Sequence, residues 1–148
     1  MNINTTILEA LAEYFSGCPL MADGRMKVDY LPGVVIEAGV EYAVASAPSE
    51  EIVYSYINGD TRCTYPFVVI KVNGHSPDGP REISDARFAE ELSAWMRKQN
   101  RSRNLPKLPK GMTPRGIKTL GFEHRYQPDA GAGRYHIKCE LEYYRKGD

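Results

Sequence analysis

The sequence predicts one α+β domain, a mixed or antiparallel sheet of about four to six strands with two main helices packed on it. Two segments carry apolar residues at helical spacing, and several others alternate apolar and polar residues as half-buried strands do. No internal repeat or low-complexity boundary divides residues 1–148, and 42% of the residues are hydrophobic, enough for one core. The expected order of elements is α-β-β-β-β-α-β-β.

The first third of the chain predicts a helix followed by two strands. The helix has one apolar stripe, formed by Ile7, Leu8, Leu11, Tyr14 and Phe15. Asn4 is its expected N-cap, and Gly17 is expected to end it. Apolar and polar residues then alternate at Met26 to Tyr30 and at Val40 to Val44, which predicts two strands with one buried face each.

The strongest local signal is a hairpin centred on Asn58-Gly59, a pair that favours a two-residue type I′ turn. With that turn, Ile57 faces Asp60, and counting outward predicts the residues of the buried face. They are Ile52, Tyr54, Tyr56, Thr61, Cys63 and Tyr65. Beyond them, Phe67 to Ile70 is apolar on both faces, as in a strand covered on both sides, and Pro66 is expected at an edge or bulge.

A second helix is predicted after Ser84, its expected N-cap. Its apolar stripe is formed by Phe88, Leu92, Trp95 and Met96. Pro106 and Pro109 stop the helix from continuing, while Leu105 and Leu108 are expected to hold the connector against the body.

The last two predicted strands are residues 117–126 and 134–144. The second has the clearest alternation in the chain. Its inward residues are Tyr135, Ile137, Cys139, Leu141 and Tyr143, and its outward residues are Arg134, His136, Lys138, Glu140 and Glu142.

Charge is unevenly distributed along the chain. Of 19 basic and 19 acidic residues, residues 1–60 hold two basic and nine acidic ones, which leaves 17 basic and ten acidic residues, an excess of seven positive charges, for the rest. No acidic residue lies between Glu91 and Glu123, a stretch that contains Arg97, Lys98, Arg101, Arg103, Lys107, Lys110, Arg115 and Lys118. This run predicts either a solvated helix end and loop or a surface for phosphate or an acidic partner.

No residue pattern indicates a catalytic or cofactor site, so the sequence predicts neither an enzyme nor a bound cofactor. The loop from His75 to Asp78 has the Gly and Pro content of an exposed turn. Glu50-Glu51 and Glu90-Glu91 are adjacent residues that point in different directions and make poor acid/base pairs. Glycine-rich phosphate-binding motifs are missing from the sequence.

A metal site is likewise not predicted. His124 and His136 would approach each other across the last hairpin, but Cys139 lies on the opposite face by parity. Cys18, Cys63 and Cys139 are odd in number and widely spaced, which favours buried free thiols. The sequence also lacks the roughly 20-residue apolar stretch of a membrane span and a signal-peptide pattern, so we expect a protein made in the cytoplasm.

Tyrosine is the conspicuous residue type, with ten copies concentrated in the predicted strands. Tyrosine suits sheet packing and also protein interfaces, because it combines apolar area with a polar tip. Together with the basic run, the strand tyrosines are the features that folding explains least. The predicted oligomer or partner contacts are therefore Tyr54, Tyr56, Arg101, Arg103, Lys107, Lys110 and Arg115.

Five short segments occur in a distinctive order and spacing: Cys18-Pro19, Met26-Lys-Val-Asp-Tyr-Leu31, Tyr56-Ile-Asn-Gly-Asp60, Asn104-Leu-Pro-Lys-Leu108 and Gly133-Arg-Tyr-His-Ile-Lys-Cys-Glu-Leu141. In these segments the chain resembles, over nearly its whole length, a family of minor structural proteins of tailed phages that infect Gram-positive bacteria. It departs from the family pattern at His136 and Lys138, where glutamine is common, and in a longer stretch between Leu31 and Ile52. These positions bear on contacts more than on the fold.

The resemblance implies a tail-terminator-like fold and a tail terminator or head-to-tail joining function without enzymatic activity. It further implies a homo-oligomeric, hexameric ring that contacts the tail-tube protein and head connector proteins at the head-tail junction of the virion. A minor capsid or connector protein on the portal side is the alternative. A nucleic-acid-binding module using residues 97–118 is the alternative of another class, with no sequence-specific recognition expected.

Overall fold

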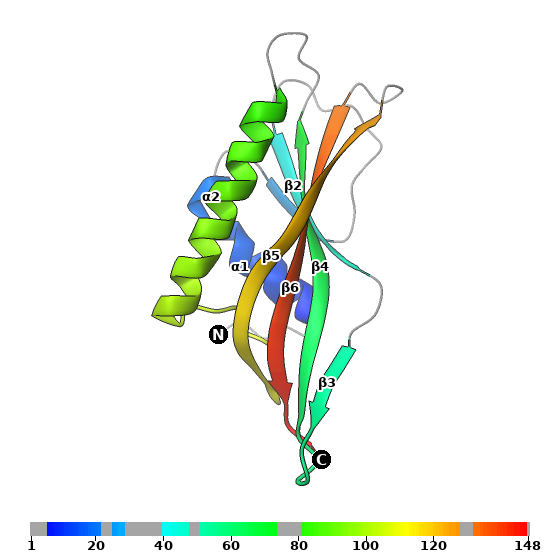
Figure 1. Ribbon diagram of the computed structural model, residues 1–148, viewed down its shortest axis with the longest axis vertical. Coiled ribbons are helices and arrows are strands. Elements are labelled where there is room, and N and C mark those ends of the chain that lie inside the picture. The colour runs from blue at the N-terminus through cyan, green and yellow to red at the C-terminus, as the bar shows by residue number, and fades with distance from the viewer. Residues whose placement is uncertain are drawn as a thin grey trace.

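The computed structural model describes residues 6–21, 25–28, 40–47, 51–73, 81–127 and 132–147. It confirms the predicted α+β class and the predicted order of elements (Figure 1). The elements are α1 (Ile7–Ser16), a 3-10 turn η1 (Pro19–Met21), β1 (Arg25–Val28), β2 (Val40–Ser46), β3 (Glu51–Ser55), β4 (Thr61–Asn73), α2 (Arg81–Ser102), β5 (Met112–Gln127) and β6 (Ala132–Arg145).

Within these residues the strands form one six-stranded mixed sheet in the order β1-β2-β4-β6-β5. β3 pairs with the first part of β4, and β2 pairs with the second part, on the same side of β4. Among the described strand pairs, only β1–β2 is parallel. Pro66 lies in the interior strand β4, between the stretches that pair with β3 and with β2. The Pro66 carbonyl accepts a hydrogen bond from the Ala47 N–H, which follows β2. The nitrogen of Pro66, which has no hydrogen to donate, therefore faces the gap between β3 and β2, where no strand needs a donor.

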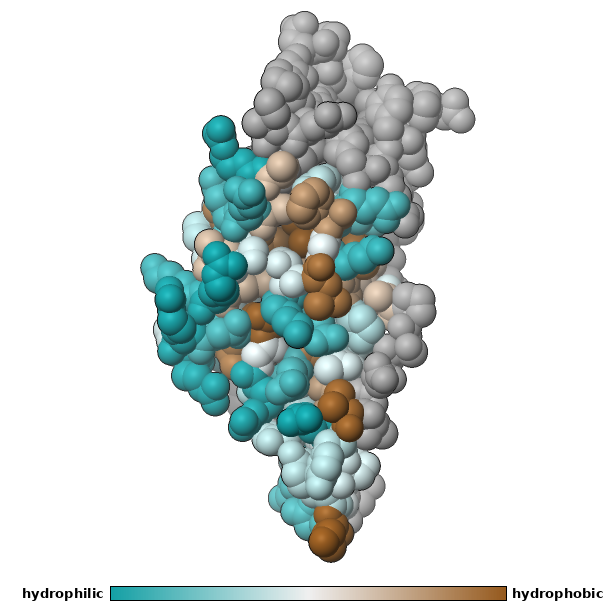
Figure 2. Space-filling view, in the orientation of Figure 1, coloured by the Kyte–Doolittle hydropathy of each residue, from teal (hydrophilic) through white to brown (hydrophobic). Residues whose placement is uncertain are grey.

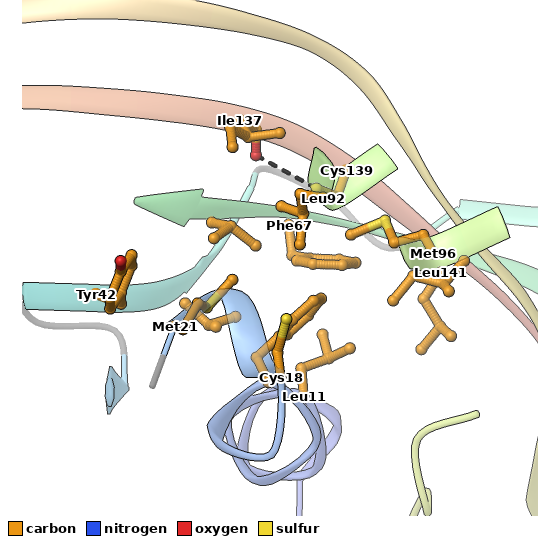
Figure 3. Close-up of a cluster of buried hydrophobic side chains, with 14 of the residues drawn as sticks. Leu11, Cys18, Met21, Tyr42, Phe67, Leu92, Met96, Ile137, Cys139 and Leu141 are labelled. Carbon is orange, nitrogen blue, oxygen red and sulfur yellow. Dashed lines mark hydrogen bonds between the residues drawn. The ribbon is translucent and has the colours of Figure 1, made fainter. Parts of the chain in front are cut away.

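Both helices pack on one face of the sheet and enclose a single main core (Figure 3). α1 contributes Leu11, α2 contributes Leu92 and Met96, and the strands contribute Phe67 and Leu141, all essentially without exposed surface. Each such side chain contributes about 1.5–3 kcal/mol by leaving water. The predicted inward residues of the last strand, Tyr135, Ile137, Cys139, Leu141 and Tyr143, are all buried, which confirms its alternation.

Two helix starts differ from prediction. The N-cap of α1 is Thr6, not Asn4, because the Thr6 hydroxyl accepts from the Glu9 N–H at 3.0 Å and donates to the Glu9 carboxylate at 2.9 Å. α2 begins at Arg81, so Ser84 lies inside its first turn instead of capping it. The residue types that cap helices also occur within first helical turns, so the composition alone did not decide at which residue each helix begins.

The predicted two-residue turn of the β3–β4 hairpin is wrong. Gly59 donates to the Tyr56 carbonyl at 3.0 Å, and Tyr56 donates to the Asp60 carbonyl at 2.8 Å. Gly59 has φ +94°, whereas Asn58 is not among the residues with positive φ, as a type I′ turn would require. The loop is a three-residue type I turn closed by a glycine bulge, and it places Ile57 at the tip.

The longer turn shifts the hairpin register by one residue. Tyr54 pairs with Arg62, which lies on the face of the sheet away from the helices, and Tyr56 shares that face. The prediction that these two tyrosines are buried beside Cys63 is therefore wrong, because a slip of one residue moves every side chain to the other face. A bulge at Val53 adds a second shift of one residue, so that Ile52 pairs with Cys63 and not with Tyr65, the partner that a two-residue turn would give it.

Candidate interaction surface

The lower ends of β4, β5 and β6, together with β3, extend beyond the helices and form a distal tip (Figure 1). On the face away from the helices this tip carries a tyrosine patch, which we define as Tyr54, Tyr56, Tyr144, Arg115 and Ile57. Tyr54 is 54% exposed and Ile57 fully exposed. Figure 2 shows an apolar spot at the lower tip, where the β3–β4 turn lies. Ile57 and Tyr54 are both exposed at this tip, and clustered exposed apolar side chains are more typical of contact sites than single ones.

The patch is assembled by cross-strand pairing. Tyr54 on β3, Arg62 on β4, Tyr144 on β6 and Thr113 on β5 are register partners, in that order across the sheet. The rings of Tyr54 and Tyr56 lie 4.7 Å apart between centroids, and those of Tyr56 and Tyr144 lie 5.8 Å apart, edge to face. These contacts hold the aromatic side chains in one arrangement before any partner binds.

Charge and hydrogen bonding fix the patch further. The Arg115 guanidinium lies 4.5 Å from the centroid of the Tyr144 ring, a cation-π contact. Tyr56 donates a hydrogen bond to the Tyr144 hydroxyl at 3.2 Å, and this bond, with a smaller contribution from lost solvation, raises the pKa of Tyr56. The Tyr56 phenol therefore stays neutral at physiological pH, and the patch presents a cation beside an uncharged aromatic side chain.

A shallow concavity of about 830 Å³ lies against the patch. Its lining combines the three tyrosines with polar groups of the hairpin turn and the chain end. The lining residues are Tyr54, Ser55, Tyr56, Ile57, Asn58, Asp60, Gly111, Thr113, Tyr144 and Lys146. The aromatic walls and the polar rim are the composition expected of a protein contact site.

The hairpin turn beside this concavity is tied to the C-terminal end of the chain. The Asp60 carboxylate accepts from the Gly147 N–H at 2.8 Å and from the Asn58 amide at 3.2 Å. A Cβ atom on Gly147 would lie 2.5 Å from the Gly59 carbonyl, so the two glycines allow a close backbone approach. The tip is thereby a defined surface and not a loose loop end.

The predicted contact residues divide into two groups. Tyr54, Tyr56 and Arg115 meet in the tyrosine patch. The other four, Arg101, Arg103, Lys107 and Lys110, are exposed at the end of α2 and in the connector to β5. The hydrophilic surface over the C-terminal half of α2 is visible at the left of Figure 2.

Sequence reasoning missed Tyr144 and Ile57. Parity offered a signal for Tyr144, because Tyr143 faces the core and its neighbour must face the other way. Ile57 had no comparable signal, since the length of the turn decides whether it sits in a strand or at the tip.

Of the other side chains considered for chemistry, those that the structure describes are not brought together. His136 lies on the outer face and Cys139 in the core, while the side chain of His124 and the residues His75, Asp78 and Glu50 lie outside the described parts. Burial raises the pKa of the Cys139 and Cys18 thiols, which makes them poor nucleophiles. Within the described ranges no three His, Cys, Asp or Glu side chains gather in a geometry that would hold a metal ion.

No known protein family matches the chain, and no curated protein matches its sequence. In the part of the chain that the structure describes, no helix is long and apolar enough to span a membrane.

Proposed function

We propose that the protein is a non-enzymatic structural subunit of a tailed phage, a tail terminator or head-to-tail joining protein that assembles as a homo-oligomeric ring. The observation that carries the assembly part of this proposal is the tyrosine patch, a fixed group of exposed aromatic and apolar side chains at one end of the subunit. The phage part rests on the sequence segments that resemble the phage family.

The composition of the patch favours a protein partner. Tyrosine and arginine are enriched among the residues that contribute most to binding, and the patch combines three tyrosines with Arg115. The tyrosine rings pack against one another and Arg115 covers a face of Tyr144, so few ring faces remain for stacking on nucleotide bases. An exposed isoleucine at the tip adds apolar area that water disfavours.

The patch lies at one end of the subunit, so a contact between it and a different surface of the next copy is heterologous. Such contacts close into a ring when the rotation between copies permits, and a hexamer is the expected ring. In this account one ring face stops the tail tube and the other meets the head connector, at the head-tail junction of a virion assembled in the bacterial cytoplasm. A minor capsid protein on the portal side is the alternative role.

Light scattering of the purified chain tests the assembly. We expect a ring-sized particle for the wild type and a monomer for Tyr54→Ser combined with Ile57→Ser, because both exposed side chains lose their contact area. Leu120→Ser is the matched control, since Leu120 is 55% exposed but lies outside the patch. A monomeric wild type, or equal assembly of the patch variant and the control, would contradict the proposal, provided circular dichroism shows all variants folded.

Deletion of the gene from the phage that carries it tests the role. A tail terminator predicts tail tubes of irregular, excessive length, because nothing stops their growth. Tails of normal length that fail to join heads would favour the portal-side alternative, and normal virions would refute both roles.

A further inference from the structure

The end of α2, the connector and the first half of β5 carry a run of exposed cations, the basic arc. It consists of Arg97, Lys98, Arg101, Arg103, Lys107, Lys110, Arg115 and Lys118, all of them exposed. Lys118 contacts Glu140 at 3.7 Å, and Arg115 is shared with the tyrosine patch. Basic residues in a last helical turn offset the helix dipole, but that explanation does not extend to the connector and β5.

The basic arc is held in a fixed shape. The Asn100 side chain donates to the Ile117 carbonyl at 2.7 Å and accepts from the Ile117 N–H at 2.9 Å, which joins α2 to β5. The Tyr14 hydroxyl donates to the Asn104 carbonyl at 2.9 Å and ties the connector to α1. A charged surface that is already ordered loses less entropy on binding than a flexible one.

The backbone conformation of Arg103 is an independent indication that the basic arc has a function. Its N–H donates to the Asn100 carbonyl and the Asn104 N–H donates to the Gln99 carbonyl, so Arg103 occupies the left-handed position that ends α2. Its φ is +60°, a conformation for which glycine is the usual residue. An arginine kept there costs stability, and such strained residues concentrate at functional sites.

The chemistry of the basic arc differs from that of the tyrosine patch. The exposed large hydrophobic residues of the described chain are Val53, Tyr54, Ile57, Leu120 and Phe122, and none lies within residues 97–118. Protein interfaces need apolar or aromatic anchors, whereas nucleic-acid interfaces are more polar and strongly positive. Trp95 packs against Tyr14 and Phe15, 5.3 and 6.0 Å between ring centroids, which removes it from base stacking.

From these features we propose that the basic arc binds the phosphate backbone of duplex DNA without sequence preference. Phosphates are contacted by arginine and lysine alike, and such contacts carry no sequence information. The proposal does not require the ring, although a ring at a DNA passage would bring several basic arcs to one duplex.

Fluorescence anisotropy of a labelled DNA duplex, titrated with the full chain at several salt concentrations, tests the proposal. If about six phosphates are neutralised, the logarithm of the binding constant should fall with the logarithm of salt with a slope of about −5. Affinity should then drop about 1,000-fold between about 50 and 200 mM salt and should be the same for unrelated sequences. A slope shallower than about −1 would overturn the proposal.

The double variant Arg101→Gln/Arg103→Gln should reduce the steepness of the slope by about two, since each lost phosphate contact lowers it by about one. Arg87→Gln is the matched control, an exposed arginine on the same helix outside the basic arc, and should leave the slope unchanged. Equal slopes for both variants would refute the proposal.

Light scattering on the same samples separates this proposal from the ring. If the double variant loses its oligomer and the wild type fails to bind DNA, the basic arc contacts an acidic protein surface, which overturns the inference and leaves the ring intact. Salt-dependent DNA binding by a monomeric wild type would support the inference and refute the ring.

Discussion

Asn100 offers the sharpest test of how helix α2 is joined to the edge of the sheet. Its side-chain amide forms hydrogen bonds with both the N–H and the carbonyl of Ile117, as a neighbouring strand would. These bonds lie on the outer edge of β5, where no other described strand pairs with it. Sheet edges left open invite pairing with other chains, so this contact also blocks the edge at that point. Replacing Asn100 by alanine should remove both bonds without adding bulk.

The expected cost of Asn100→Ala follows from these two bonds. A hydrogen bond contributes about 1 kcal/mol net, and a buried backbone group left without a partner costs about 1–3 kcal/mol. Ile117 is 2% exposed, but Asn100 is only half-buried, so water can replace part of the loss. We expect a decrease of about 2 kcal/mol in the free energy of unfolding, or about 4–8 °C in Tm.

Asn100→Asp separates the two bonds. The carboxylate can still accept from the Ile117 N–H, but its other oxygen faces the Ile117 carbonyl and repels it. This contact raises the folded-state pKa of the introduced aspartate carboxyl above its unfolded value of about 3.9. The folded state then binds more protons, so the stability deficit at pH 7 should shrink as pH falls through the folded pKa toward pH 4.

Urea unfolding followed by circular dichroism, at pH 7 and at about pH 4, measures both effects. Ser102→Ala is the control, because the Ser102 hydroxyl bonds only to carbonyls of its own helix. The deficit of Asn100→Ala relative to wild type should not change with pH. A cost below about 0.5 kcal/mol for Asn100→Ala, or wild-type stability of Asn100→Asp at pH 7, would refute the role assigned to Asn100.

Three further predictions concern stability and reactivity. Arg103→Gly should raise the free energy of unfolding by about 1 kcal/mol, because glycine adopts φ +60° without strain, and an unchanged or lower Tm would contradict this. Gly147→Ala should displace the chain end from the Gly59 turn and speed amide exchange at residues 58–60, with less than about 1 kcal/mol lost globally; unaltered exchange would count against the contact. The three cysteines, all buried, should resist a thiol reagent at pH 8 until the protein unfolds, and rapid labelling of Cys139 in the native state would contradict its raised pKa.

The sequence alone was sufficient for the fold class and for the final strand. From Tyr135 to Tyr143 every second residue is apolar. Because the side chains of a strand alternate between two faces, these five apolar residues share one face, which was predicted to be the buried one. The apolar stripes predicted both helices just as directly, because the spacing of their residues fits no other regular element.

The candidate site was harder to predict because it depends on register. Tyr54 and Tyr56 were predicted both as contact residues and as part of the buried hairpin face, and the three-residue turn places them on the outer face instead. Asn58-Gly59 is compatible with either turn length, so local preference could not decide. The bond pair between Asn100 and Ile117 joins residues 17 positions apart on two elements, a contact that periodicity cannot reveal.

Native mass spectrometry of the purified chain over a range of concentrations shows whether the subunits form a ring, because a ring has a defined mass. A hexamer of the 16.6 kDa subunit, six times that mass, gives a particle of about 100 kDa. We expect a closed oligomer of fixed stoichiometry that dissociates in the Tyr54→Ser/Ile57→Ser variant. A monomer at every concentration, or an oligomer that grows without a fixed number of subunits, would contradict it.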